Sequence, residues 1–231
     1  MSRSQNNRRH LIVLTNPRSP ISESYRTLRT NIDFSSVDQV TQVIMVTSAG
    51  PEEGKSTVVG NLAVTYAQDN RNVLLIDADM RKPTVHRTFQ LSNIAGLSSV
   101  LSRQFSLDEA IQATEIPNFY VMTAGAIPPN PAEMLNSKSM AQLMAELREQ
   151  FDVILIDTPP VLAVTDAQLL ASQSDGVLMV INTGKVKKEI ALKAKETLQR
   201  VNARMLGVVL NNVKRKASEE YYYYYYASND N

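Results

Sequence analysis

The 231 residues suffice for one large α/β domain or two small ones, and a composition of 43% hydrophobic and 20% charged residues is that of an ordinary globular protein. A formal net charge of +1 gives no sign of a nucleic-acid partner, and the absence of cysteine excludes disulfides, thiol catalysis and thiolate metal sites. No apolar run approaches the roughly 18 to 20 residues that a membrane-spanning helix needs.

The first predicted element is a helix in the segment SPISESYRTLRTNIDF. Its apolar residues are spaced by four, three and four positions, as in the stripe of an amphipathic helix: Ile21, Tyr25, Leu28 and Ile32. We expect this stripe to pack on the rest of the domain.

The same helix carries a polar row, Glu23, Arg26 and Arg29, at every third position. At about 100° per residue Glu23 and Arg26 point well away from the apolar stripe and Arg29 lies at its flank, so we expect the row to face outward. On its own, such a row is typical of a solvated face with weak ion pairs.

Six apolar runs of strand length follow, and most are apolar on both faces: QVIMVTSA, NVLLIDAD, NFYVMTAG, DVILIDTPP, GVLMVINTG and MLGVVLNN. Helix-like segments lie between them at 57–68, 137–150 and 187–201. This alternation predicts an α/β fold with a doubly wound, mostly parallel sheet flanked by helices. In such a sheet the ligand site lies beyond the carboxyl ends of the strands.

The first strand is followed by AGPEEGKST, which fits the phosphate-binding P-loop except that Ala49 replaces the usual first glycine. This replacement is tolerable if Ala49 keeps a negative φ. Backbone N–H groups, a lysine and a hydroxyl would then meet the phosphates and Mg²⁺ of ATP or ADP. The predicted nucleotide-binding residues of this loop are Pro51, Glu52, Glu53, Gly54, Lys55, Ser56 and Thr57.

Carboxylates close two further strands. Asp77 and Asp79 follow NVLLI, and Asp157 follows DVILI in the Walker B arrangement. Together with the P-loop they predict a metal–nucleotide site in which Ser56, Asp77, Asp79 and Asp157 hold Mg²⁺.

The last strand ends in Asn211 and Asn212. An amide pairs a donor with an acceptor and can read an adenine edge, so Asn211 is a candidate for the base pocket. A simple turn of the chain explains the two asparagines equally well.

The segment 214–231 contains six consecutive tyrosines and then polar residues. A homopolymer has no helical or strand period, so we predict an exposed, flexible tail after a single domain that spans 1–213. The tyrosines are Tyr221, Tyr222, Tyr223, Tyr224, Tyr225 and Tyr226.

The combination of SAGPEEGKST, LLIDADMRKP, ILIDTPP and a terminal tyrosine cluster resembles the bacterial tyrosine kinase (BY-kinase) family, in particular the cytosolic kinases of capsular polysaccharide operons of the staphylococcal CapB type. The resemblance runs from about Ser19 to the C-terminus. It implies an ATP-dependent protein-tyrosine kinase with a MinD/ParA-like P-loop fold, in which Lys55 and Ser56 hold phosphates and Mg²⁺ and the tyrosines accept phosphate. Because the tyrosine phenol has a pKa near 10, we assign Asp77 as the proton acceptor, with Asp79 supporting it at the metal.

The resemblance also implies partners. ESYRTLR matches the ExxRxxR motif of self-association in this family, so Glu23, Arg26 and Arg29 are expected at the interface between subunits of a ring. The helix that carries this interface belongs to the N-terminal segment 1–35. In such a ring, the tail of one subunit would enter the active site of its neighbour. A membrane-spanning activator protein with a cytosolic segment would hold the kinase at the inner face of the membrane, and a cognate tyrosine phosphatase would reverse the reaction. No nucleic-acid partner is expected. The implied role is regulation of capsular or exopolysaccharide synthesis and export.

Two rival functions stay open from the sequence. A MinD/ParA-type partitioning ATPase would use hydrolysis as a timer, but it normally carries a signature lysine where this chain has Gly50, and it needs no tyrosines. The second rival function is that of a regulatory module, which would bind nucleotide without turning it over.

Overall fold

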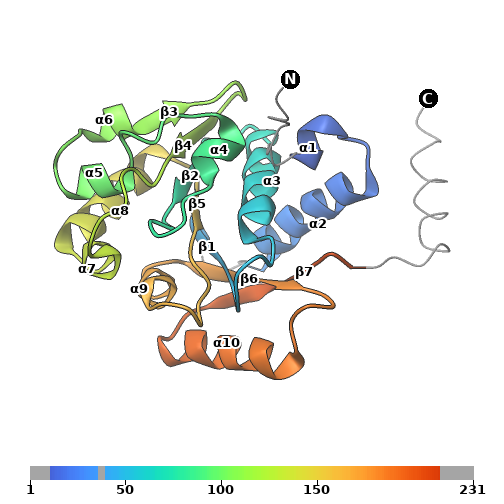
Figure 1. Cartoon of the computed structure of the whole chain (residues 1–231). Coiled ribbons are helices and arrows are strands. Elements are labelled where there is room, and N and C mark those ends of the chain that lie inside the picture. The colour runs from blue at the N-terminus through green and yellow to red at the C-terminus, as the bar shows by residue number, and fades with distance from the viewer. Residues whose placement is uncertain (1–10, 36–39, 214–231) are drawn as a thin grey trace, which may run out of the picture.

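The computed structural model describes residues 11–35 and 40–213, and within them seven strands form one sheet in the order β3-β4-β2-β5-β1-β6-β7 (Figure 1). All neighbouring strands are parallel except β3, which runs antiparallel to β4. The strands are β1 Val43–Ser48, β2 Val73–Asp77, β3 Ile111–Ala113, β4 Phe119–Met122, β5 Val153–Asp157, β6 Gly176–Asn182 and β7 Met205–Asn211. The mostly parallel sheet is therefore confirmed.

Helices cover both faces of the sheet, as the buried contacts and Figure 1 show. One face is covered by α1 Ile12–Thr15, α2 Pro20–Phe34, α3 Lys55–Ala67 and α4 Val85–Phe89. The other is covered by α5 Leu97–Leu101, α6 Leu107–Ala110, α7 Pro131–Leu135, α8 Lys138–Gln150, α9 Asp166–Ala171 and α10 Lys188–Arg200. None of the helices in the described ranges is both long and apolar enough to cross a membrane.

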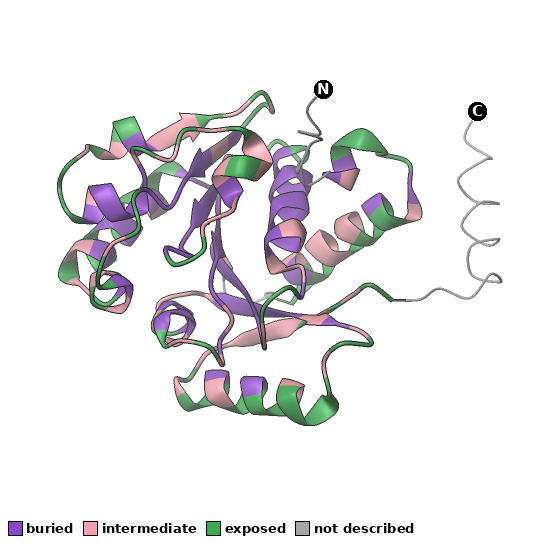
Figure 2. Cartoon of the chain, in the orientation of Figure 1, coloured by how far each residue is buried: buried purple, intermediate pink, exposed green. Residues whose placement is uncertain are grey.

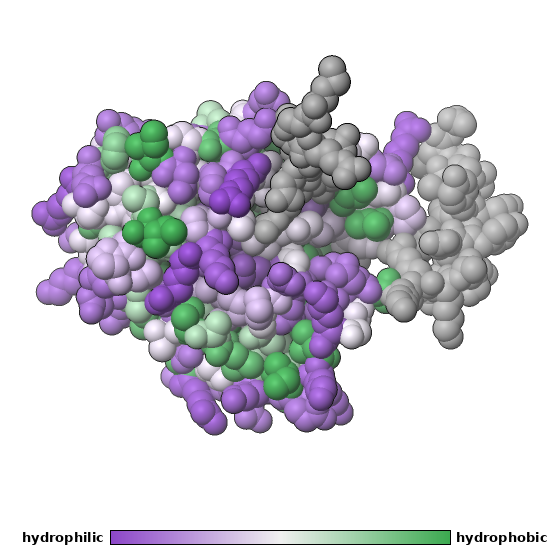
Figure 3. Space-filling model, in the orientation of Figure 1, coloured by the Kyte–Doolittle hydropathy of each residue, from purple (hydrophilic) through white to green (hydrophobic). Residues whose placement is uncertain are grey.

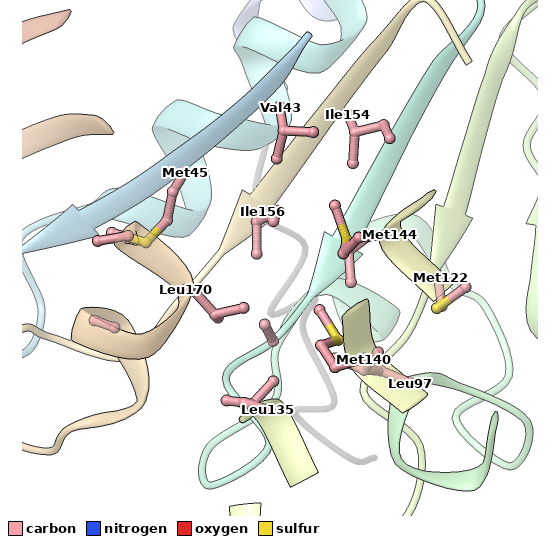
Figure 4. Close-up of a cluster of buried hydrophobic side chains, with 14 of the residues drawn as sticks. Val43, Met45, Leu97, Met122, Leu135, Met140, Met144, Ile154, Ile156 and Leu170 are labelled. Carbon is pink, nitrogen blue, oxygen red and sulfur yellow. The ribbon is translucent and has the colours of Figure 1, made fainter. Parts of the chain in front are cut away.

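The continuous apolar runs form strands because each strand is buried on both faces. Along β1, Val43 and Met45 face the α8 side of the sheet, whereas Ile44 and Val46 face α3. On the α8 side, methionines from strand and helix pack together with branched side chains (Figure 4). Figure 2 shows the result: the central strands and α3 are largely buried, whereas α10, on the other face of the sheet, exposes its outer side. In the same orientation, hydrophilic residues cover most of the described surface and hydrophobic ones are scattered among them (Figure 3).

The longer elements lie where the sequence places them. The predicted helices correspond to α2, α3, α8 and α10, and the six apolar runs form every strand except β3. The short β3, with only Ile111, Gln112 and Ala113, gives no sequence signal, and neither do the helices of four to six residues.

One part of the α2 stripe differs from the prediction. Ile32 is buried, and Tyr25 and Leu28 pack against the core, but Ile21 is 51% exposed. The expectation that Ile21 packs on the domain is wrong, because Ser22 is the fully buried side chain in the first turn of α2 and Ile21 lies beside the edge strand β7 instead.

Candidate nucleotide-binding site

The predicted site residues come together because parallel strands end at the same edge of the sheet. Asp77 is paired in register with Asp157 of the adjacent β5, and β5 is the neighbour of β1, which leads into the loop 49–54. On the other side of β1, Asn182 of β6 is paired with Asn211 of β7. Residues from four strands, and the loop that follows β1, thus gather at the edge of the sheet where α3 begins.

The P-loop has the backbone that its sequence requires. Ala49 is buried and is not among the described residues with positive φ, so the condition for replacing the first glycine is met. Gly54 has a φ of 92°, and a Cβ at this position would collide with the side-chain amide of Asn211. Gly54 also caps α3 without a side-chain hydrogen bond, and the first turn of the helix carries no acid. The N-terminal N–H groups of α3 are therefore suited to bind an anion.

Lys55 is held among carboxylates. Its Nζ lies 3.3 Å from Asp79 Oδ2 and 4.0 Å from Asp157 Oδ1, and the Asp157 side chain is fully buried. An ammonium group at the end of the P-loop motif and between two acids is placed to exchange these partners for phosphate oxygens.

Asp77 shapes the segment that follows β2. Its Oδ1 accepts the Asp79 N–H at 3.2 Å, and its Oδ2 accepts the N–H groups of Thr84 and Val85, each at 3.0 Å. Burial, together with the nearby charge of Asp157, raises the pKa of Asp77 to about 7, although the two bonds to Oδ2 act in the opposite direction. Asp77 is thus both a structural acceptor and a carboxyl group that binds a proton near neutral pH.

The acids do not form a metal cage by themselves. Across 11–35 and 40–213, no three histidine, cysteine or acidic side chains gather as ligands for one ion. Mg²⁺ at phosphates commonly takes only one or two protein oxygens and completes its shell with water and the nucleotide. Ser56, at the start of α3, and the buried Asp157 fit such a partial donor set.

Glu53 is a site residue whose side-chain role the sequence did not reveal. Its carboxylate is only 2% exposed and accepts the N–H of Gly50 within the loop and that of Asn182, at 3.3 Å. Its own carbonyl accepts the Asn211 amide at 2.9 Å. The only available signal was an acid at an unusual place inside a phosphate-binding loop.

A second contact that the sequence did not reveal joins the DADMRKP segment to α9. Arg81 donates to both oxygens of Asp166, at 2.9 and 3.0 Å, and the Asp166 side chain is fully buried. Arg81 belongs to the quoted motif, but nothing in the sequence indicates its partner.

The sequence left two roles open for Asn211 and Asn212, a contact with the nucleotide base and a turn of the chain. Asn212 has a φ of 56°, which is the conformation of a turn residue. Asn211 holds the P-loop through Glu53, and its contact with a nucleotide base stays a prediction.

The polar row of α2 is not uniformly directed outward. Glu23 and Arg26 form an exposed pair at 2.8 Å. Arg29, whose side chain is only 20% exposed, instead contacts Asp69 and the carbonyl of Thr65, each at 3.2 Å. The expectation of an outward-facing row is therefore wrong for Arg29, because its flank position brings the guanidinium within reach of the C-terminal end of α3.

The fold and this site define a P-loop nucleotide-binding protein with MinD-like architecture. The model of an AAA domain matches residues 41–208. The cell division ATPase MinD of Pyrococcus furiosus has a TM-score of 0.65 at 26% identity, with 77% of this chain and 74% of that chain covered.

Other similar proteins indicate a narrower family. The chain is 51% identical to the tyrosine-protein kinase YwqD of Bacillus subtilis, over 89% of this chain and 87% of the relative, and 41% identical to the putative tyrosine-protein kinase CapB of Staphylococcus aureus, over 88% and 89%. The crystal structure of the chimerical protein CapA2B2 has a TM-score of 0.87 at 44% identity, covering 89% and 90%. The chain belongs to the family of bacterial tyrosine-protein kinases.

Proposed function

We propose that this protein is an ATP-dependent protein-tyrosine kinase. Its substrates are the tyrosines Tyr221 to Tyr226, in its own chain or in another copy of it. The observation that carries the proposal is the position of Lys55, the lysine of the P-loop motif, between Asp79 and Asp157. Kinase similarity over nearly nine-tenths of the chain supports tyrosine, rather than water, as the acceptor.

We assign some residues of the site to phosphate and metal binding and one residue to proton transfer. Lys55 and the N–H groups at the start of α3 offset the charge of the phosphates, while Ser56 and Asp157 hold Mg²⁺, with Asp79 in support. Bound Mg²⁺ neutralises charge on the transferring group. Asp77 accepts the phenol proton, and a pKa of about 7 makes it a stronger base than an ordinary aspartate. A carboxylate has about four lone-pair sites, so the backbone bonds of Asp77 leave capacity for this proton.

The tail has the reach that the reaction needs. β7 ends at the same edge of the sheet as the P-loop, since β7 is parallel to β6 and β6 to β1. The eight residue-to-residue steps from Val213 to Tyr221 extend at most about 26 Å at about 3.3 Å per step. This length permits transfer within one chain or to a neighbour, and we favour a neighbour in a ring joined through Glu23, Arg26 and Arg29.

The wider setting follows from the same family. We propose that a membrane-spanning activator protein holds the kinase at the inner face of the cell membrane through a cytosolic segment, and that a cognate phosphatase resets the tail. The process regulated would be capsular or exopolysaccharide synthesis and export. The similarity to CapB supports this setting.

Intact mass after incubation with ATP and Mg²⁺ tests the proposal. The samples are the full chain, Lys55→Met, Asp77→Asn, a chain ending at Glu220, and a mixture of Lys55→Met with the chain ending at Glu220, each with and without a candidate activator segment. We expect a ladder of added phosphates on the full chain and, in the mixture, on the Lys55→Met chain, which would establish transfer between chains. Asp77→Asn should lose at least a hundredfold in rate.

Phosphate released to solution without any ladder would replace the kinase with a partitioning-type ATPase. A ladder on the full chain but none in the mixture would refute transfer between chains, and an undiminished ladder on Asp77→Asn would refute its role as the base.

A further inference from the structure

A groove of about 890 Å³ lies between α2 and the edge strand β7; its lining contains none of the carboxylates of the nucleotide site, and it shares Asn211 with that site. One face of α2 lines it, through Ile21, Ser24, Tyr25 and Leu28, which lie at helical spacing. Ile21 is the residue of the predicted apolar stripe that does not reach the core, so the stripe continues into the groove instead of ending against the domain. We call this feature the α2–β7 groove.

The other wall of the α2–β7 groove is the edge of the sheet. Residues 208–213 all line it, and since side chains of a strand alternate between its faces, six consecutive residues reach the groove through the outer edge of the backbone. β7 has no neighbour on that side within the described residues. An exposed edge strand is a template for a further strand.

The lining is uncharged. Among the described residues that line the α2–β7 groove there is no Asp, Glu, Lys or Arg, and two of the lining residues, Leu210 and Val208, are 59% and 48% exposed overall. An aromatic segment with hydroxyl groups suits such a surface, because serine, threonine and asparagine side chains lie among the apolar ones. A doubly charged phosphate finds no cation in it.

The chain itself delivers such a segment to this place. Val213, the last described residue, lines the α2–β7 groove, and Asn212 before it has the left-handed backbone of a residue that begins a reverse turn. Eighteen residues follow, from Lys214 to Asn231, and they include Tyr221 to Tyr226. Attachment beside the groove gives the tail a high effective concentration.

We propose that the unphosphorylated tyrosines of the tail dock in the α2–β7 groove of their own chain, as a segment added along the edge of β7. Because the six residues are identical, the segment can pair with the backbone of β7 in several registers, so docking does not depend on one particular tyrosine. Each phosphate adds about 1.5 to 2 negative charges to a ring that must enter an uncharged groove, and phosphorylation therefore releases the tail. The proposal rests on the proposed function only in taking these tyrosines as acceptors.

Cysteine cross-linking tests the docking in a chain that has no cysteine of its own. In a full-length Lys55→Met background, Ser24→Cys in the groove is combined with Tyr223→Cys in the tail, and a short bismaleimide is added at low protein concentration. The matched control replaces Ser24→Cys by Lys185→Cys. Lys185 is 63% exposed, is two residues from Thr183, which contacts Asn211, and does not line the groove.

We expect the Ser24 pair to join within one chain at least tenfold faster than the Lys185 pair. Ile21→Glu, which puts a charge into the groove at a helix position that favours acids, should remove the difference, whereas Ile21→Leu should preserve it. Replacing the other five tyrosines by glutamate should also remove it. None of these measurements needs phosphoryl transfer, so they separate docking from the proposed function.

Equal rates at Ser24 and Lys185 would refute the proposal. Products that join two chains would also refute it and assign the α2–β7 groove to a second copy. A rate at Ser24 that is unchanged by Ile21→Glu or by the glutamates would contradict the uncharged groove as the docking site.

Discussion

Glu53 puts a negative charge inside the loop that we propose to bind phosphate, although phosphate itself is an anion. The arrangement is sound because the carboxylate is turned away into the protein, where it accepts the N–H groups of Gly50 and Asn182. Its burial means that these bonds are shielded from water. Glu53 therefore fixes the loop to β6, and its carbonyl fixes the loop to β7 through Asn211.

Glu53→Ala should weaken ADP binding about tenfold, because two buried N–H groups lose their acceptor and the loop loses its preorganised shape, an effect of about 1.4 kcal/mol. Glu53→Gln should have a smaller effect, since an amide oxygen still accepts. Titration calorimetry measures the affinity, and a thermal melt confirms that the variant is folded. Glu146→Ala is the matched control, because Glu146 lies on the exposed side of α8 and outside the P-loop. Equal losses for Glu146 and Glu53 would contradict the role of Glu53.

The residues that the sequence predicted and those it missed differ in a physical way. Lys55, Asp77 and Asp157 each follow an apolar strand, and parallel pairing alone brings strand ends together. Glu53 and Asn182 are 129 positions apart, and Arg81 and Asp166 are 85 apart. Their contacts depend on side-chain directions that only the folded packing determines.

At the scale of elements, Arg81 and Asp166 join the loop after β2 to the first turn of α9. Asp79, which contacts Lys55, lies two residues before Arg81. The two partners differ in exposure, since Asp166 is fully buried whereas Arg81 is 41% exposed. Loss of either partner should therefore loosen the segment, but the free-energy costs should be unequal.

Arg81→Met should lower the free energy of unfolding by about 3 kcal/mol, because it leaves a carboxylate in the interior without its cation. Asp166→Asn should cost only about 1 kcal/mol, because Arg81 can turn toward water. Urea denaturation measures both, and the double variant should recover part of the loss of Arg81→Met. Equal costs for the two single variants would show that burial of Asp166 does not control the pair.

The length of an element decides whether the sequence predicts it. α2, α8 and α10 carry an apolar stripe over 13 or 15 residues, and the apolar strands are bounded by turn residues. α4 and α5 have five residues each, which is little more than one turn and too short for a period. They exist because neighbouring groups hold them, as the Asp77 carboxylate does where it accepts the Thr84 and Val85 N–H groups at the start of α4.

At the scale of the molecule, an ion pair helps to hold the edge of the sheet opposite the site. Arg148, in the last turn of α8, contacts both oxygens of Asp175, at 2.9 and 2.7 Å, and Asp175 also accepts the N–H groups of Gln42 and Val43. Burial alone would raise the pKa of Asp175, but the bonds from Arg148 and the backbone outweigh it and hold this pKa below its ordinary value.

Because the pKa of Asp175 is lowered in the folded state, its stabilising effect is present above the unfolded pKa of about 3.9 and is lost as pH falls through the folded value. Asp175→Asn should therefore cost about 1 to 2 kcal/mol at pH 6, and the difference from the natural chain should shrink toward pH 3. Urea denaturation at several pH values measures it. A difference independent of pH would mean that the shape of the side chain matters rather than its charge. The matched control is Asp108→Asn, on the exposed surface of α6, which should change little at any pH.

Variants of the polar row of α2 can test subunit association separately from folding. Arg29 contacts α3 of its own chain, so Arg29→Ala should lower the free energy of unfolding by about 1 kcal/mol and does not by itself test a ring. Glu23 and Arg26 form an exposed pair, and their replacement by alanine should change this free energy by less than about 1 kcal/mol. If these two side chains form a subunit interface, the double variant should be folded and monomeric in light scattering under conditions where the natural chain assembles. A folded double variant that still assembles would place the interface elsewhere on the molecule.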